Sequence, residues 1–227
     1  MTKSKKSSNL MTYAGTLGAL IILGVVLTIA SPNFLTFNNM MSILRQSSFN
    51  ALVSIGMLVC LITAGIDLSV GANATFCACL AGMLVQKGVT NSFILLIVAI
   101  LAGVLGWING MLLTRLHLPH PFVSTLGMKN VLWGAGLIIT SSQMVSFSGI
   151  DGVMWLGSAS VGNFPVAFIV VIVIYIIMHI LLTRTSLGRS IYCCGGNPEA
   201  ARLSGINSAN VLTFCYTLSG FMAALAG

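Results

Sequence analysis

Asp67 is one of only three acidic residues in this chain of 227, and it stands between two long apolar segments, flanked by Gly65 and Gly71. A carboxylate in such surroundings, next to helix-breaking glycines, is typical of a polar break in a membrane helix, where a solute path or binding site can form. A structural role fits the same pattern, because Gly65 would end one helix and Asp67 or Ser69 would cap the next. The residues alone leave both interpretations open.

Residues suited to other chemistry are sparse. The three carboxylates lie far apart in sequence, which leaves little material for a catalytic acid–base pair. None of the six cysteines has zinc-site spacing, and His117 and His120 lie in a proline-bracketed turn without a neighbouring thiol or carboxylate. No phosphate-binding glycine loop occurs. We therefore expect no metal, no cofactor and no bond chemistry catalysed by this chain.

The composition indicates that the segments that must position Asp67 lie in a membrane. Hydrophobic residues make up 57% of the chain and charged residues only 6%, whereas a soluble domain has about 25% charged residues. Mean hydropathy is +1.03. The net charge of +7 comes mostly from basic residues scattered at the ends of apolar segments. Such scattering carries topology information and provides no basic face for nucleic acid.

Seven apolar segments, each near the ~20 residues that a spanning helix requires, organise the chain. They are residues 10–30, 49–66, 69–86, 92–114, 122–140, 165–183 and 208–227. This pattern predicts an all-α fold: a polytopic membrane helical bundle of about seven spans in one transmembrane domain over residues 1–227, with a broken or capped helix pair around Asp67. Segments 31–48 and 141–164 would lie outside the membrane.

The basic residues predict a cytoplasmic N-terminus. With that orientation the inner segments hold seven basic residues and the outer segments two. The inner set is Lys3, Lys5, Lys6, Arg115, Arg184, Arg189 and Arg202, and the outer set is Arg45 and Lys87.

The inner loop 184–207 contains the signals of a short helix. Asn197 is an N-cap residue, Pro198 suits the first helical position, and Glu199 adds an acid to the first turn. Gly205 would end this helix after Ser204. A compact charged helix between two spans could be pushed by a partner protein, although an ordinary connector would look the same.

One apolar segment also carries a packing signal. Ala102, Gly106 and Gly110 recur at every fourth position. Small residues at this spacing allow close approach of two helix backbones, so we expect a helix–helix contact there.

Four blocks of the sequence suggest a family. Residues 65–71, Gly-Ile-Asp-Leu-Ser-Val-Gly, resemble the signature of sugar-importing ABC transporter permeases of the ribose/galactose/xylose class. Residues 47–57, 121–127 and 187–206 resemble further blocks of the same family, in the same order.

The resemblance implies the membrane subunit of an ATP-driven importer in the bacterial inner membrane. Its partners would be a cassette ATPase, a periplasmic sugar-binding protein that delivers a monosaccharide, a second permease copy forming a homodimer, and membrane lipid. The translocation path would include Gly65, Asp67, Ser69, Gly71 and Asn50. Glu199, Ala200, Ala201 and Gly205 are similar to the coupling loop that docks the ATPase.

The chain also departs from the family pattern. Cys215-Tyr216-Thr217-Leu218 stands where importers carry Ile-x-Leu-Pro, and Trp133 precedes Gly134 where relatives often have arginine. Relatives continue further and carry a second glycine-rich block, so we expect this chain to be truncated, with the C-terminal third of the family fold absent.

Other transport functions stay open at this point. A secondary transporter could couple uptake to protons through Asp67. A related ABC permease could carry nucleosides, autoinducer-like sugars or branched-chain amino acids. A passive channel is disfavoured because no ring of charged residues is evident. The sequence does not name the solute.

Overall fold

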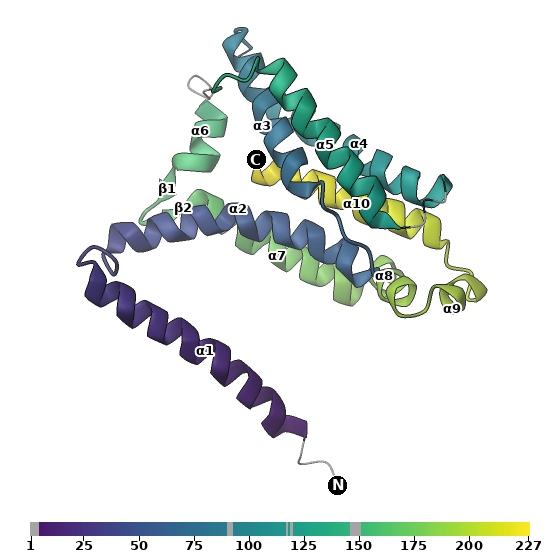
Figure 1. Cartoon of the computed structure of the whole chain (residues 1–227), viewed down its shortest axis with the longest axis horizontal. Coiled ribbons are helices and arrows are strands. Elements are labelled where there is room, and N and C mark those ends of the chain that lie inside the picture. The colour runs from purple at the N-terminus through teal and green to yellow at the C-terminus, as the bar shows by residue number, and fades with distance from the viewer. Residues whose placement is uncertain (1–4, 90–92, 117, 119, 146–150) are drawn as a thin grey trace. The chain divides into compact units, whose positions relative to one another are not determined.

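The computed structural model describes residues 5–89, 93–116, 118, 120–145 and 151–227 (Figure 1). Contacts divide the chain into two units, Met1–Leu44 and Arg45–Gly227. The helices are α1 (Lys5–Ala30), α2 (Phe37–Ile62), α3 (Val70–Gln86), α4 (Phe93–Arg115), α5 (Pro121–Ile139), α6 (Asp151–Ser158), α7 (Val166–Arg184), α8 (Ser186–Gly196), α9 (Pro198–Leu203) and α10 (Ser208–Ala226). The strands β1 (Ser160–Val161) and β2 (Phe164–Pro165) form a two-residue antiparallel hairpin. The predicted all-α class is confirmed.

The helices also support the predicted spans. Within the described part of the chain, five helices are long and apolar enough to cross a membrane: α2, α4, α5, α7 and α10. Two shorter apolar helices, Ala14–Ala30 and Val70–Gln86, coincide with the remaining predicted segments. Each of the seven predicted segments therefore corresponds to a helix, and the fold is a polytopic helical bundle.

The first half of α2 differs from the expectation. Segment 31–48 was expected to form a separate external piece, but α2 begins at Phe37 and continues unbroken to Ile62. Residues 37–62 contain no proline, and their one glycine is Gly56. Nothing therefore stops the helix where the hydropathy falls, because polar side chains lower hydropathy without breaking a helix.

Closest packing in the Arg45–Gly227 unit occurs between α4 and α10, which run side by side in Figure 1. The backbone of α4 at Gly106 touches the Tyr216 carbonyl oxygen of α10, and Gly220 touches the Ala102 carbonyl oxygen. A Cβ atom at Gly110 would lie 2.6 Å from the Cα of Thr213. The predicted small-residue contact is thus confirmed, and α10 is the helix that occupies it.

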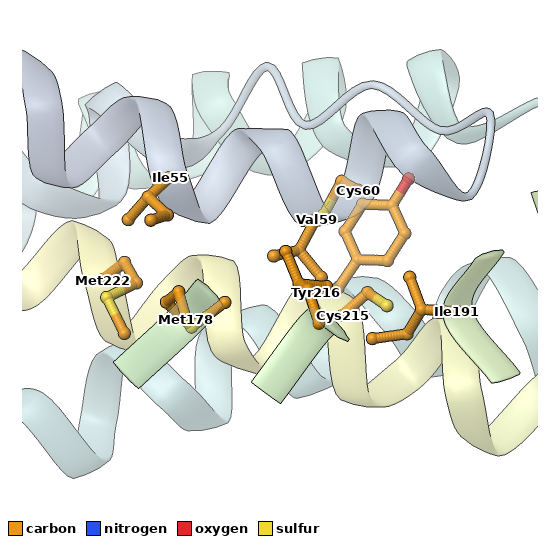
Figure 2. Packing of buried hydrophobic residues seen from close by; sticks show 9 residues of the cluster. Ile55, Val59, Cys60, Met178, Ile191, Cys215, Tyr216 and Met222 are labelled. Atoms are coloured by element: carbon orange, nitrogen blue, oxygen red, sulfur yellow. The ribbon is translucent and has the colours of Figure 1, made fainter. Parts of the chain in front are cut away.

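A second packed region joins α2, α7, α8 and α10. Its buried members are Ile55, Val59, Cys60, Met178, Leu182, Ile191, Cys215, Tyr216 and Met222, and Figure 2 shows most of them from close by. The α2 backbone comes close to α10 here as well, because a Cβ at Gly56 would lie 3.0 Å from the Cβ of Met222. α10 therefore contacts both α4 and α2, and it lies next to the turn that follows α2.

Candidate functional site

The connection between α2 and α3 is a tight turn that buries Asp67. The helix ends after Ile62, and Ala64 adopts a left-handed conformation with φ of 59°. The amide of Gly65 then donates to the Cys60 carbonyl at 3.0 Å. The predicted break is present, but the left-handed residue is Ala64, whereas the sequence pointed to Gly65. Only a few per cent of non-glycine residues adopt positive φ, so the local sequence did not identify Ala64 as the left-handed residue.

Asp67 organises the start of α3. Its Oδ1 accepts hydrogen bonds from the Ser69 amide at 2.9 Å and from the Ser69 hydroxyl at 2.6 Å. Ser69 occupies the N-cap position of α3, but its side chain makes no capping hydrogen bond to the helix. The polar turn is therefore an Asp-centred turn in which Asp67 fixes Ser69, and α3 follows immediately.

Three neighbouring helices complete this network. Ser219 of α10 donates to Asp67 Oδ2 at 2.7 Å, and the side-chain amide of Asn109 in α4 donates to the Ser69 hydroxyl at 2.8 Å. Ser124 of α5 donates in turn to Asn109 Oδ1 at 3.3 Å. Asp67, Ser69 and Asn109 are each at most 2% exposed. The turn is thereby tied to α4, α5 and α10 through side chains that are shielded from solvent.

Asp67 has neutral partners. Within the described ranges the structure records one ion pair, between Glu199 and Arg202, and it does not involve Asp67. Burying a carboxylate is costly unless its oxygens are hydrogen-bonded, and here three donors satisfy them. The arrangement can hold a polar turn inside an apolar helical body.

Sequence reasoning missed the network partners Ser219, Asn109 and Ser124. Each is a polar residue inside an apolar segment, which is a detectable signal. That signal does not say which polar residues meet, because Asn109 and Ser219 lie 40 and 152 positions from their partners in the turn.

Tyr216 contributes a further polar atom to this region. Its side chain is 1% exposed, and its hydroxyl has no hydrogen-bond partner among the described residues. A Cβ at Gly65 would lie 2.6 Å from that hydroxyl oxygen. Figure 2 shows the hydroxyl directed toward the end of α2, next to Cys60. Glycine at position 65 therefore makes room for Tyr216.

The five predicted path residues fall into two groups. Gly65, Asp67 and Ser69 are buried together in the turn. Gly71 is exposed, and a Cβ there would meet nothing within 4 Å. Asn50 is exposed on α2, roughly three turns before the helix ends. The structure brings the first three into one network and leaves Gly71 and Asn50 outside it.

A cavity lies elsewhere in the Arg45–Gly227 unit. Its volume is about 380 Å³, and mainly apolar side chains of α2, α3, α4, α6, α7 and α10 line it. None of the described residues that line it is a predicted path residue. The cavity therefore does not mark the predicted site.

The loop after α7 forms two helices where one was predicted. Asn197 caps α9 as expected, because its Oδ1 accepts from the Ala200 amide at 3.0 Å, and Pro198 takes the first helical position. Gly205 follows the end of α9 with φ of 80°, a conformation that suits glycine. The additional helix, α8, precedes Asn197, and its N-cap Thr185 accepts from the Gly188 amide at 3.1 Å.

The predicted coupling residues lie on α9 and directly after it. Glu199, Ala200 and Gly205 are exposed, whereas Ala201 is buried. Glu199 and Arg202 form an exposed ion pair with an N–O distance of 3.2 Å, which contributes little to stability. The α9 surface that faces outward therefore carries both charges.

The described residues contain no group of three or more His, Cys, Asp or Glu side chains that could hold a metal ion. His117, half of the histidine pair considered from the sequence, lies outside the described residues.

Comparison with known proteins decides the family. Residues 39–227 match the family described as "Branched-chain amino acid transport system / permease component", so the match includes both the Asp67 turn and the α8–α9 loop. The chain belongs to this permease family. The resemblance inferred from residues 65–71 and 187–206 is confirmed.

Curated relatives of this permease include sugar permeases. The chain is 34% identical to the ribose import permease protein RbsC of Bacillus subtilis over 218 residues, covering 96% of this chain and 67% of that protein. It is 31% identical to RbsC of Haemophilus influenzae, covering 92% of this chain and 65% of the relative. It is 36% identical to the D-allose transport system permease protein AlsC of Escherichia coli, covering 98% and 69%.

The chain thus spans about two thirds of the length of the curated relatives it matches. No solved structure is significantly similar to it. The permease relatives and the apolar helices together indicate a multi-pass inner membrane protein.

Proposed function

We propose that this permease is the membrane subunit of an ATP-driven importer that translocates a monosaccharide. The observation that supports this most directly is the likeness to ribose and allose permeases over more than nine tenths of the chain. The family match over residues 39–227 includes both the buried turn and the exposed loop. The chain itself would catalyse no reaction, and ATP hydrolysis would occur on a separate cassette subunit.

The proposed assembly contains a cassette ATPase, a periplasmic binding protein that delivers the sugar, and a second copy of the permease. Residues 1–227 would contribute one transmembrane domain to it, with the N-terminus in the cytoplasm. Contact between the loop and the α2 end supports placing both on the same membrane side, in agreement with the orientation that the basic residues favour.

We assign two roles within this assembly. The buried turn with Gly65, Asp67 and Ser69, together with exposed Gly71 and Asn50, would border the translocation path. The loop residues Glu199, Ala200, Ala201 and Gly205 would receive the ATPase. The exposure of Glu199, Ala200 and Gly205 supports this docking role, and so does Leu203, an apolar side chain that is 79% exposed at the end of α9.

The test is uptake of radiolabelled ribose and allose by proteoliposomes that contain the permease with its co-purified partners. We expect uptake that requires ATP and persists when a protonophore collapses the proton gradient. Uptake that needs the proton gradient and no ATP would overturn the proposal and favour a proton-coupled secondary transporter.

Loop variants test the docking role in the same assay. Gly205→Val forces a β-branched side chain into a left-handed conformation, whereas Gly205→Asn is tolerated there. We expect Gly205→Val and Glu199→Ala to lose sugar uptake while ATP hydrolysis continues, and Gly205→Asn to stay close to wild type. Normal import by the first two variants would refute the role of this loop.

A further inference from the structure

One backbone contact joins the exposed loop to the buried turn. Gly195, in the last turn of α8, lies directly against the carbonyl oxygen of Ile62, the final residue of α2, and close to the Cα of Thr63. A Cβ on Gly195 would overlap that carbonyl oxygen. The neighbouring Gly196 has nothing within 4 Å of its Cβ position. The two adjacent glycines thus differ completely in their surroundings.

The side chain of Ile191 strengthens the same contact. Ile191 precedes Gly195 by four positions, so both lie on one face of α8. It is fully buried in the cluster that contains Val59 and Cys60 of α2. The last turns of α2 are therefore held by α8 through both a side chain and the backbone.

α8 is also anchored at its other contacts. Gly188 lies against the carbonyl oxygens of Leu181 and Leu182 in α7. The Cys194 thiol is 3.6 Å from the Ser208 hydroxyl at the start of α10. Through these contacts α8 touches three spanning helices: α2, α7 and α10.

The turn between Ile62 and Asp67 is short, and backbone hydrogen bonds hold its first residues. The amides of Thr63 and Gly65 both donate to the Cys60 carbonyl, at 3.1 and 3.0 Å, and the Ala64 amide donates to the Leu61 carbonyl at 3.0 Å. These bonds fix the turn to the last residues of α2. The start of the turn that carries Asp67 is therefore hydrogen-bonded directly to the last turn of α2.

We propose that Gly195 is the positioning residue through which the α8–α9 loop sets the place of the α2 end and of the Asp67 turn. This inference rests on the proposed function, since the force on the loop would come from the ATPase. Glycine is required because any side chain would separate the α8 and α2 backbones.

The experiment compares Gly195→Ala with Gly196→Ala in the reconstituted assembly. Both change one glycine to alanine in the same helical turn, but only the first adds an atom at the α2 contact. We expect Gly195→Ala to reduce the number of sugar molecules imported per ATP hydrolysed at least severalfold, and Gly196→Ala to retain the wild-type ratio. A third variant, Ile191→Val, removes one methyl group from the same contact without overlap and should lower the ratio by a smaller factor.

A direct readout follows the turn itself. A cysteine replaces exposed Ile66 in a Cys193→Ser background, and its rate of reaction with a water-soluble thiol reagent is measured with and without ATP and vanadate. We expect nucleotide to change the labelling rate of this cysteine in the protein with an unaltered α8–α9 loop and in the Gly196→Ala variant. We expect no such change in the Gly195→Ala variant. A purely structural role for Gly195 would lower protein yield and leave the nucleotide response of the folded fraction intact.

The outcomes separate the two proposals. If the assembly with the wild-type permease shows no ATP-dependent uptake, the proposed function fails. If wild type imports with ATP while Gly195→Ala and Ile191→Val keep both its import ratio and its labelling response, the role of Gly195 is refuted. If the Gly195→Ala variant does not assemble, the Ile191→Val variant tests the role of Gly195 instead. An import ratio and a labelling response equal to those of wild type in Ile191→Val would then refute the proposal.

Discussion

The Ser219 hydroxyl lies 2.7 Å from Oδ2 of Asp67, and the two residues are 152 positions apart in the chain. α10 therefore supplies a donor to the carboxylate that α2 and α3 leave between them. The backbone of α10 also touches Gly106 of α4. This helix connects the polar turn to the most closely packed helix pair of the structure, so the turn is held by the body of the permease.

Ser219→Ala tests how much this hydrogen bond stabilises the fold. It leaves Asp67 Oδ2 buried without its donor, which should lower the free energy of unfolding by about 1–3 kcal/mol. Thr217→Ala is the control, because the one hydrogen bond of the Thr217 hydroxyl among the described residues goes to the Thr213 carbonyl of its own helix at 2.8 Å. The Tm of each variant is measured by thermal unfolding of the purified protein in detergent. Equal shifts in Tm for Ser219→Ala and Thr217→Ala would contradict a special role for Ser219.

Tyr216→Phe should raise stability. The substitution removes a buried hydroxyl that has no hydrogen-bond partner among the described residues, and an unsatisfied buried group costs about 1–3 kcal/mol. Tyr175→Phe is the matched control, because the Tyr175 hydroxyl donates to the Ala51 carbonyl at 3.2 Å. We expect a higher Tm for the first variant and an unchanged or lower Tm for the second. A lower Tm for Tyr216→Phe would show that its hydroxyl has a partner.

Gly65→Ala should depend on the residue at position 216. The new Cβ would lie 2.6 Å from the Tyr216 hydroxyl oxygen, while its other neighbours are at 3.4 Å or more. We therefore expect Gly65→Ala to be destabilising in the wild-type background and much less so in Tyr216→Phe. The double-mutant cycle measures this as a coupling energy, expected within about 0.5–3 kcal/mol for residues in contact. A coupling energy of zero would contradict the observed proximity.

The α4–α10 contact predicts opposite effects for two glycines of α4. Gly106→Ala places a methyl group against the Tyr216 carbonyl, whereas Gly103→Ala meets nothing within 4 Å. Overpacking typically costs about 1–3 kcal/mol, and alanine is a better helix former than glycine by about 1 kcal/mol. We expect Gly106→Ala to lower the yield and Tm of the membrane-inserted protein and Gly103→Ala to maintain or raise them. Equal behaviour would contradict the contact.

Local signals in the sequence were sufficient for some features. The break at Asp67, the Asn197 cap and the end of α9 at Gly205 depend on residues within a few positions of each other, and capping chemistry is local. The α4 contact surface was also predicted, because small residues repeat at helical spacing. Its partner α10 was not, since one sequence does not say which helices meet.

Other features required the folded chain. α8 has three glycines in eleven residues, at 188, 195 and 196, and glycine disfavours helix by about 1 kcal/mol per residue. Tertiary packing explains two of them, because Gly188 and Gly195 lie against carbonyl oxygens of neighbouring helices. The pairing of Asp67 with Ser219 likewise became visible only when distant helices were brought together.

Asp67→Asn distinguishes a need for the charge from a need for the shape of the turn. The asparagine oxygen can accept from the Ser69 amide and hydroxyl, and its NH₂ group can donate to the Ser219 hydroxyl, so the network persists. Asp67→Ala removes all three hydrogen bonds that the structure records. We expect Asp67→Asn to retain ATP-driven uptake and a Tm near that of wild type, and Asp67→Ala to lose both. Because a proton-coupled carrier would need the ionisable group itself, loss of uptake by a stably folded Asp67→Asn protein would favour that mechanism and contradict a turn that works through its shape.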